Sequence, residues 1–417
     1  MMINDWLDRL PNSWDSKRLK FAAPLRSERG SGSSADPEYI GLENIESWTG
    51  RISFEEQTES DVSDDGSGDS TTSRFIKGDV LFGKLRPYLA KAWLADRDGI
   101  CTTELLVLQS GEKILGEYLI HVLLCPHFVT MVDASTFGTK MPRANWEFIG
   151  GLRIPVPPIA IQQRVAEFLI QETAQIDALV VEKERMLALL YEKRAAEVAH
   201  AITRGLYPGI AVKSSGYPWL GEIPEHWDIQ RSKRLLIERD ERSESGSEEM
   251  LTVSHLTGVT PRSEKDVNMF EAESNEGYKL VSPENLVINT LWAWMGAMGV
   301  ARHEGLVSPA YHVYRIAPEL LPAYVDQLVR IDAFKAEVTR FSKGVWSSRL
   351  RLYPEGLHEV WLPVPPLEEQ QAIVSHLAAE RERTAELESV LRSSIGLLQE
   401  RRRALITAAV TGQIDIP

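Results

Sequence analysis

Two long stretches of the chain carry apolar residues at helical spacing. In residues 159–206 one row repeats every 11 residues, at Val165, Ile176, Leu187 and Val198, and a second row holds Phe168, Leu179 and Leu190. In residues 367–417 the spacing is seven residues, at Leu377, Leu391, Leu398 and Leu405, with Thr384 in the gap. Each stretch predicts one helix of roughly 40 to 45 residues, about 60 to 68 Å long. The two periods differ, so they predict no handedness for a coiled coil.

The two stretches are copies of one another. Pro155-Val156-Pro157-Pro158 and Gln162-Gln163 recur as Pro363-Val364-Pro365-Pro366 and Gln370-Gln371, at a constant offset of 208 residues. An apolar stripe of this length needs a partner, and we expect the two helices to pair with each other in antiparallel fashion. That pairing would place the domains that precede them at opposite ends. The alternative is that each helix pairs with a helix of another chain.

A second repeat precedes each domain. Trp6-Leu7, Pro11 and Trp14-Asp15 recur as Trp219-Leu220, Pro224 and Trp227-Asp228, at an offset of 213 residues. We expect an extended entry segment whose tryptophans pack onto the following domain, in preference to a role for them in binding a ligand.

The chain between these repeats alternates short apolar runs with Gly and Pro, which is typical of mainly-β domains. Residues 114–131 predict one helix, and residues 55–73, rich in Ser, Asp, Gly and Thr, predict a mobile loop. In the second copy, Asn289-Thr290-Leu291-Trp292-Ala293-Trp294 corresponds to Gly83-Lys84-Leu85-Arg86-Pro87-Tyr88 at an offset of 206 residues. A shared scaffold with unlike surface residues indicates two sites that read different things.

The predicted fold class is therefore α+β, with two similar mainly-β domains, each followed by a long helix, and the helices paired as an antiparallel coiled coil. The predicted boundaries are residues 1–158 for the first domain, 159–206 for its helix, 207–227 for a linker and second entry segment, 228–366 for the second domain and 367–417 for its helix.

Composition narrows the class of protein. The 417 residues are 43% apolar, enough for real cores, and neither a membrane span nor a signal peptide is indicated, so the cytoplasm is the expected location. Cys101 and Cys125 show no metal-ligand spacing and are interpreted as buried small residues. The net charge of −14 argues against a uniformly DNA-binding surface, but local basic patches such as residues 340–351 remain compatible with DNA.

No catalytic site is visible in the sequence. Residues 78–84 match the start of a phosphate-binding loop, but Leu85 stands where Ser or Thr would hold magnesium. The chain has no H-E-x-x-H motif, no methyltransferase motif and no evident partner for a nucleophile. We therefore predict a protein that is not an enzyme and that has no catalytic, metal or cofactor site of its own.

The signals for nucleic-acid binding are stronger, because basic and aromatic clusters occur at equivalent places in both domains. Arg and Asn can read purines, whereas Lys and Ser suit phosphates. The candidate DNA-binding residues are Lys84, Arg86, Tyr88, Lys91, Lys140, Arg143, Asn145, Trp292, Trp294, Lys343, Trp346, Ser347, Ser348, Arg349 and Arg351.

Nearly the whole chain resembles the DNA-specificity subunit of Type I restriction-modification systems. The resemblance rests on residues 77–88 (KGDVLFGKLRPY), 138–143 (GTKMPR), 219–227 (WLGEIPEHW) and 365–371 (PPLEEQQ). The first half departs from the second at the start of the long helix, with Ile161 where the second half has Glu369.

The resemblance implies two target-recognition domains, each of which reads one half of a split sequence in double-stranded DNA. It also implies that the helices set the spacer and dock two modification subunits, that restriction subunits join this core, and that S-adenosylmethionine, ATP and magnesium act in those partners. The competing interpretation is a structural coiled-coil adaptor whose domains bind proteins. A specificity module for a defence system that does not restrict DNA is a further alternative.

Overall fold

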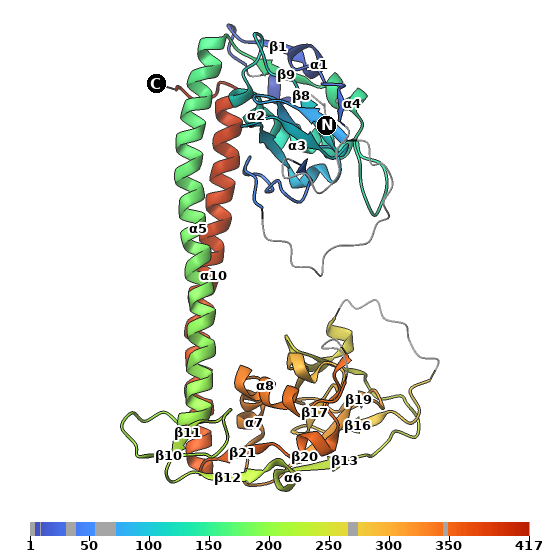
Figure 1. Ribbon diagram of the computed structural model, residues 1–417, viewed down its shortest axis with the longest axis vertical. Helices are drawn as coiled ribbons and strands as arrows, with labels where there is room; N and C mark the ends of the chain where they lie inside the picture. Colours follow the sequence, from blue (N-terminus) through green and yellow to red (C-terminus); the bar gives the residue numbers. More distant parts are fainter. Residues whose placement is uncertain are drawn as a thin grey trace. The chain divides into compact units, whose positions relative to one another are not determined.

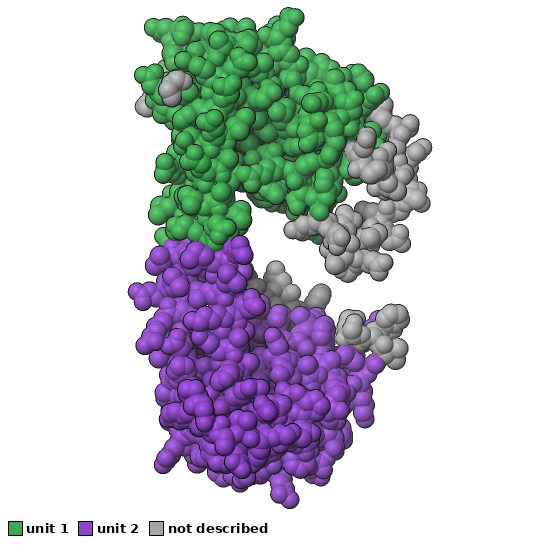
Figure 2. All heavy atoms as spheres, turned by 60° about the vertical axis from the view of Figure 1, so that its left-hand side comes forward, with its two compact units in different colours: residues 1–184, 392–417 green, residues 185–391 purple. Residues whose placement is uncertain are grey.

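The computed structural model describes residues 5–8, 10–30, 39–54, 72–265, 274–344 and 349–416. The chain divides into two compact units (Figure 2). The first consists of Met1–Glu184 with Arg392–Pro417, and the second is Arg185–Leu391. Each unit contains one mixed α+β domain together with parts of both long helices, as the sequence predicted.

The domain of the first unit is built on small sheets with short helices packed against them (Figure 1). A three-stranded antiparallel sheet has the order β6 (Ala92–Leu94), β5 (Val80–Gly83), β8 (Leu105–Leu108). A four-stranded sheet has the order β2 (Arg29–Gly30), β4 (Thr72–Phe75), β7 (Gly99–Cys101), β3 (Tyr39–Ile40). β1 (Asp15–Arg18) pairs with β9 (Arg153–Val156). The helical elements are η1 (Asp5–Leu7), α1 (Leu19–Ala22), η2 (Pro87–Leu89), α2 (Gly116–Leu123), α3 (Pro126–Ala134) and α4 (Trp146–Gly151).

The domain of the second unit repeats this plan. Its central sheet has the order β13 (Leu236–Arg239), β20 (His312–Ile316), β17 (Leu286–Ile288), β18 (Met298–Val300). Two-stranded pairs are formed by β10 (Val212–Ser214) with β11 (Glu222–Pro224), β12 (Asp228–Arg231) with β21 (Trp361–Val364), β14 (Leu251–Ser254) with β15 (Gly258–Pro261), and β16 (Lys279–Val281) with β19 (Gly305–Val307). The helical elements are α6 (Ser232–Leu235), η3 (Arg262–Glu264), η4 (Ala293–Met295), α7 (Pro322–Leu328), α8 (Asp332–Arg340) and α9 (Pro354–Leu357).

Two local predictions are corrected. The single helix expected over residues 114–131 is two helices, α2 and α3, because Pro126 begins α3 and holds Cys125 in an extended conformation with a ψ of 128°. Most of the loop expected over residues 55–73 lies outside the described residues, but Thr72 and Ser73 belong to β4.

The long helices are α5 (Ile159–Arg204) and α10 (Leu367–Val410). In the first unit, Val165 and Leu169 of α5 share one core with Ile406 and Val410 of α10. In the second unit, Ile202 near the end of α5 shares a core with residues near the start of α10, among them Ile373 and Leu377. The start of each helix therefore lies beside the end of the other (Figure 1). The prediction of an antiparallel pair is confirmed within one chain.

The first row predicted in this helix is confirmed, because Val165, Ile176 and Leu187 are buried and Val198 packs against the core of the second unit. The second predicted row is not buried throughout, because Leu179 is 52% exposed. Buried positions of α5 also follow two seven-residue rows: Gln162, Leu169 and Ile176 in one, and Ala166, Thr173 and Leu187 in the other. The predicted seven-residue row of α10 is buried at Leu377, Thr384 and Leu391. The seven-residue rows include buried polar side chains, Gln162, Thr173 and Thr384, so apolar residues alone do not mark every buried position.

One glutamine of each Gln-Gln pair joins the start of a long helix to its own domain. The side-chain oxygen of Gln162 accepts from the backbone N–H of Leu115 at 2.9 Å, and its amide donates to the carbonyls of Lys113 and Pro157. Gln370 makes the corresponding bonds with Leu321 at 2.7 Å, Glu319 and Pro365. Both glutamines are fully buried, so the repeated motif is a structural joint.

The end of each long helix is held by the domain in the same unit. Tyr118 donates its hydroxyl to the carbonyl of Val410 at 3.3 Å, and Tyr324 donates to Ile202 at 2.9 Å. Burial raises the pKa of both phenols well above the ordinary value, so they remain donors. The prediction that the entry tryptophans pack on the domains is confirmed for Trp6 and Trp227, which lie in the two main cores with exposures of 5% and 0%.

Candidate nucleic-acid interface

In the first unit, the candidate basic residues follow β5 directly. Lys84 is tied through its backbone N–H to the carbonyl of Glu104 at 3.0 Å and through its own carbonyl to Ala144. Arg86 is exposed, has a φ of 49°, and donates its backbone N–H to the carbonyl of Pro142 at 2.8 Å. A non-glycine residue in this left-handed conformation needs support from its surroundings, and hydrogen bonds on both sides supply it. The structure therefore presents the Arg86 side chain from a fixed backbone.

The Gly-Thr-Lys-Met-Pro-Arg segment forms a small hairpin beside Arg86. Phe137 and Arg143 exchange backbone hydrogen bonds at 3.0 and 3.1 Å, and Lys140 is exposed in the turn between them. The guanidinium of Arg143 forms an ion pair with the Glu104 carboxylate at 3.0 Å, while the Arg143 side chain remains 47% exposed. Glu104 therefore fixes the direction of a half-exposed arginine.

Three other candidates of the first unit, Lys91, Asn145 and Tyr88, differ in whether their side chains are hydrogen-bonded within the protein. The Lys91 ammonium donates to the carbonyl of Leu42 at 2.7 Å, and desolvation lowers its pKa. Asn145 caps α4, since its side-chain oxygen accepts from the backbone N–H of Phe148 at 2.9 Å. Tyr88 is 47% exposed in η2. Lys91 and Asn145 thus make hydrogen bonds that stabilise the domain, whereas Tyr88 faces solvent.

The second unit places its candidates on the same backbone frame. In the first unit, the backbone N–H of Gly83 donates to the carbonyl of Lys91, and that of Leu89 donates to the carbonyl of Arg86. At the 206-residue offset, Asn289 donates to Ala297, and Met295 donates to Trp292. Trp292 is 49% exposed and stacks on Trp294, with ring centroids 6.3 Å apart and an interplanar angle of 18°. The Trp294 indole is itself tied to the carbonyl of Leu291 at 3.1 Å. An aromatic pair therefore stands where the first unit carries Arg86 and Tyr88.

The second hairpin also matches the first. Lys343 and Arg351 exchange backbone hydrogen bonds at 2.9 Å, and Leu352 donates to Thr290 just as Ala144 donates to Lys84. Lys343, Arg349 and Arg351 are exposed. The remaining candidates, Trp346, Ser347 and Ser348, lie outside the described residues. The hairpin loop is two residues longer here than in the first unit, because the offset rises from 206 at its first bridging residue to 208 at its second.

Sequence reasoning missed Glu104 and two exposed apolar residues of the first hairpin. Glu104 lies some forty positions from Arg143 along the chain, so nothing local marks it as a partner. Phe137 and Met141 are 63% and 54% exposed. Only the tertiary structure shows that the hairpin exposes these apolar side chains.

The segment that resembled a phosphate-binding loop has a structural role. Asp79 is buried and pairs with Arg26, whose Nε lies 2.7 Å from its carboxylate, and it also accepts from the backbone N–H of Ile76. In the second unit, Arg239 donates to Asn285 at 3.2 Å at the corresponding place. Among the described residues there is no group of His, Cys, Asp and Glu that could hold a metal ion. Burial raises the pKa of both cysteine thiols, that of Cys101 to about 12.

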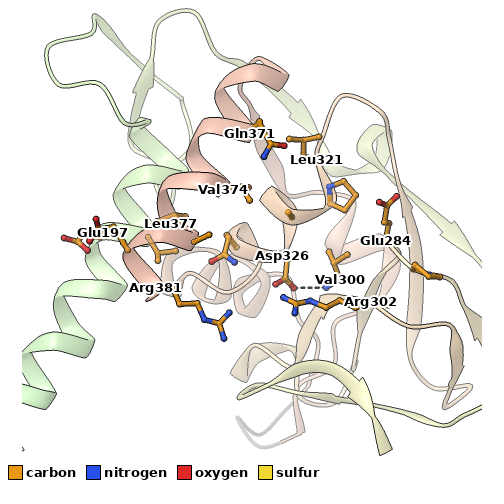
Figure 3. Close-up of a pocket in the computed structure, with 18 of the residues that line it drawn as sticks. Glu197, Glu284, Val300, Arg302, Leu321, Asp326, Gln371, Val374, Leu377 and Arg381 are labelled. Carbon is orange, nitrogen blue, oxygen red and sulfur yellow. Dashed lines mark hydrogen bonds between the residues drawn. The ribbon is translucent and has the colours of Figure 1, made fainter. Parts of the chain in front are cut away.

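The second unit also contains a pocket of about 580 Å³ beside the helix pair (Figure 3). Asp326 of α7 accepts from the backbone N–H of Val300 at 2.9 Å on one wall, and Leu377 and Arg381 of α10 lie on another. Its charged lining combines three arginines with four acids: Arg194, Arg302, Arg381, Glu197, Glu284, Asp326 and Glu380. This mixture of charges does not define the chemistry of a ligand.

None of the helices within the described ranges is long and apolar enough to cross a membrane. The fold and the two matched surfaces define a class of protein with a repeated α+β domain, an antiparallel helix pair within one chain, and unlike exposed side chains on one shared frame. Residues 42–184 match the family model of the Type I restriction modification DNA specificity domain.

Individual relatives agree with this match. The chain is 25% identical over 246 residues to the specificity subunit of the Type I restriction enzyme EcoDI of Escherichia coli, a match that covers 58% of this chain. The chain spans about half the length of that relative, 52%. It is 21% identical over 359 residues to the EcoBI specificity subunit of Escherichia coli, which covers 81% of this chain and 73% of the relative. The resemblance inferred from the motifs, to the specificity subunits of Type I systems, is confirmed.

Solved structures show the same fold. A chain from a study of complex assembly and conformational transition in a type I R-M system aligns with a TM-score of 0.71 at 20% identity, covering 97% of this chain and 99% of that one. The HsdS subunit from Thermoanaerobacter tengcongensis aligns with a TM-score of 0.50 at 20% identity, covering 99% and 100% of the two chains.

Proposed function

We propose that this chain is the sequence-specific DNA-recognition subunit of a Type I restriction-modification complex, with one half of a bipartite site read by each domain. The observation that carries the proposal is the pair of matched surfaces. The hydrogen bond that the Arg86 carbonyl accepts from Leu89 recurs at Trp292, and those of Gly83 with Lys91 and of Lys84 with Ala144 also have counterparts, while the exposed side chains differ. One scaffold with two different surfaces is what reading two unlike half-sites requires.

The candidate residues divide by chemistry. Arg86, Lys140 and Arg143 in the first unit, and Lys343, Arg349 and Arg351 in the second, are exposed cations that suit phosphates or guanine. Lys84, Tyr88, Trp292 and Trp294 complete the proposed surfaces. Trp346, Ser347 and Ser348 stay predictions from the sequence. Lys91 and Asn145 are retained at the edge of the first surface, where they position its backbone.

The long helices are proposed to set the distance between the half-sites and to dock two modification subunits. Their outer faces carry exposed apolar side chains within each unit. In the first unit these include Leu179, Val181 and Leu397, and in the second Met186, Leu189, Leu387 and Val390. Apolar groups on the outside of a paired helix support contact with a partner protein.

The chemistry would then belong to the partners. We propose that this subunit is not catalytic, that it acts in the cytoplasm, and that modification and restriction subunits supply the S-adenosylmethionine, ATP and magnesium chemistry. The competing proposal, a structural adaptor that binds proteins through both domains, predicts no affinity for double-stranded DNA.

Exchange of one domain tests the proposal. Residues 228–362 are replaced by the equivalent domain of a relative, and methylation sites are mapped in a host that expresses the modification subunits. One half-site is expected to change while the other stays the same. A change in both half-sites contradicts the two-reader model. A gel shift with double-stranded DNA, using the purified chain alone and with modification subunits, distinguishes the DNA-recognition subunit from the structural adaptor. Absence of DNA binding at low salt in both states favours the adaptor.

A further inference from the structure

The matched frames allow residues of the two surfaces to be compared position by position. Arg143 and Arg351 occupy the same place, the second bridging residue of each hairpin. Arg86 and Trp292 hold equivalent topological positions, since each precedes a short 3-10 helix and accepts a hydrogen bond from the residue three positions later, although their φ angles differ, at 49° and −122°. One pair of positions is identical in chemistry, and the other differs completely.

This difference separates two tasks. A side chain shared by two surfaces that read unlike sequences cannot account for the difference between those sequences. A shared arginine suits the phosphate backbone, which is the same at every site and fixes register. Of the two positions compared, the one that differs, residue 86 in one unit and residue 292 in the other, can distinguish bases.

Arg86 suits a guanine. Its side chain is exposed, and among the described residues no acid forms an ion pair with it, in contrast to Arg143, which Glu104 holds at 3.0 Å. Its backbone is fixed by hydrogen bonds to Pro142 and Leu89. A guanidinium that is free to turn its full fork outward from a fixed backbone can donate to both O6 and N7 of guanine in the major groove.

Trp292 suits a thymine. Its indole is held by stacking on Trp294, which is tied to the carbonyl of Leu291, so the pair offers a rigid apolar face. Trp292 remains 49% exposed despite this stacking. In the major groove, only thymine presents a methyl group, and apolar side chains read it by contact.

We propose that Arg86 reads a guanine in one half-site, that Trp292 reads a thymine in the other, and that Arg143 and Arg351 contact phosphates that set the register of each domain. The inference rests on the proposed function, because it names the bases read at the two surfaces. It assigns part of the specificity to one topological position that the two domains fill differently.

The first experiment uses base analogues with the full-length chain, in the presence of modification subunits if DNA binding requires them. The bipartite site is first obtained by selection from a random duplex library. Each guanine of one half-site is then replaced by 7-deazaguanine, which lacks the N7 acceptor, and each thymine of the other half-site by uracil, which lacks the methyl group. For the wild-type chain, one guanine replacement is expected to weaken binding about tenfold. One uracil replacement is expected to weaken it about fourfold, the worth of one buried methyl group.

The variants connect each effect to its residue. Arg86→Ala is expected to abolish the sensitivity to 7-deazaguanine and leave the sensitivity to uracil, whereas Trp292→Ala does the reverse. Trp292→Phe, which keeps an apolar face, is expected to retain part of the uracil effect. Arg18→Ala, an exposed arginine of the same unit on a different element, serves as the control and should retain both sensitivities. Thermal unfolding verifies that each variant is folded.

The outcomes are distinguishable. A wild-type chain that selects no bipartite sequence overturns the proposed function itself. A wild-type chain that selects one, but whose analogue sensitivities persist in Arg86→Ala and Trp292→Ala, overturns this inference alone. The inference is also overturned if uracil replacement does not weaken binding of the wild-type chain while Trp292→Ala lowers its affinity. That result indicates an indole inserted between bases.

The phosphate role has its own readout. Arg143→Ala and Arg351→Ala should each weaken binding to all sequences by a similar factor and reduce the slope of log affinity against log salt by about one. An altered base preference in either variant contradicts the register role.

Discussion

Arg402 of α10 and Asp177 of α5 form a buried ion pair in the first unit, with Nε 2.8 Å from the carboxylate and side chains only 8% and 11% exposed. The same guanidinium donates to the backbone carbonyls of Trp48 at 2.6 Å and Thr49 at 3.1 Å. One arginine therefore joins both long helices to a loop of the domain. At the 208-residue offset the second unit has Arg194 and Ala385, so this joint is not repeated there.

Loss of this arginine should destabilise the first unit. Arg402→Ala leaves Asp177 with Arg51, at 2.9 Å, as its remaining cation and removes the donor of the Trp48 and Thr49 carbonyls, which is expected to cost about 1 to 3 kcal/mol. The measurement is urea unfolding, followed by hydrogen exchange to locate the effect in residues 46–51. Arg194→Ala, the matched control, is expected to change stability by less than about 0.5 kcal/mol. Equal effects of the two variants would show that the buried pair contributes no net stability.

A buried histidine beside Arg402 should make stability depend on pH. Burial, and secondarily the charge of Arg402, lowers the pKa of His121 to about 3, against an ordinary value of 6.5. Above pH 6.5 both folded and unfolded chains hold a neutral ring; below it only the unfolded chain takes up the proton, so stability falls between about pH 6.5 and pH 3. At pH 5 the loss from this group is about 2 kcal/mol.

The variant His121→Gln tests this contribution, because Gln327 occupies the equivalent position in the second unit. Urea midpoints at pH 7.5 and pH 5 should lie closer together in the variant than in the wild type. An unchanged difference between the two midpoints rules out His121 as the titrating group.

The glutamine joints should be equally important in both units. Gln370→Ala leaves the N–H of Leu321 and two carbonyls without their buried partner, and each lost hydrogen bond to a buried group costs about 1 to 3 kcal/mol. Gln371→Ala, at an exposed neighbouring position, is the control. Thermal unfolding should give a clearly lower midpoint for Gln370→Ala than for Gln371→Ala. Equal midpoints would show that water replaces the buried amide of Gln370.

Asn145 should affect stability more than recognition. Its side chain caps α4, so Asn145→Ala is expected to cost about 1 kcal/mol while the selected DNA sequence stays the same. Asn145→Asp keeps the accepting oxygen and should restore stability. A changed base preference in the alanine variant would instead assign Asn145 to readout.

Lengthening both helices should lengthen the unread spacer under the proposed function. Tyr191 and Glu388 are joined by a hydrogen bond, so insertions after Leu190 and after Glu388 fall at one level of the pair. Seven added residues in each helix preserve the buried rows and add about 10.5 Å, close to three base-pair steps of 3.4 Å. A methylation map should show the longer spacer, and an unchanged spacer contradicts the proposal that the helices set it.

The repeat determined much of this protein directly from the sequence. Constant offsets predicted two copies of one domain, and the apolar spacing of residues 367–417 predicted a long paired helix, because internal repetition and helical periodicity are properties of order along the chain. The correspondence of residues 83–88 with residues 289–294 also came from the sequence, and the matched hydrogen bonds of β5 and β17 bear it out.

Other features were decided only by tertiary contacts. The apolar pattern of α5 did not show its seven-residue rows, because Gln162 and Thr173 hold buried positions as polar side chains. Their partners come from elsewhere in the chain or from the preceding helical turn. The pairing of Glu104 with Arg143 likewise depends on segments far apart in sequence. Pattern along the chain determines which elements form, whereas the direction and engagement of a side chain depend on neighbours that only the folded chain brings together.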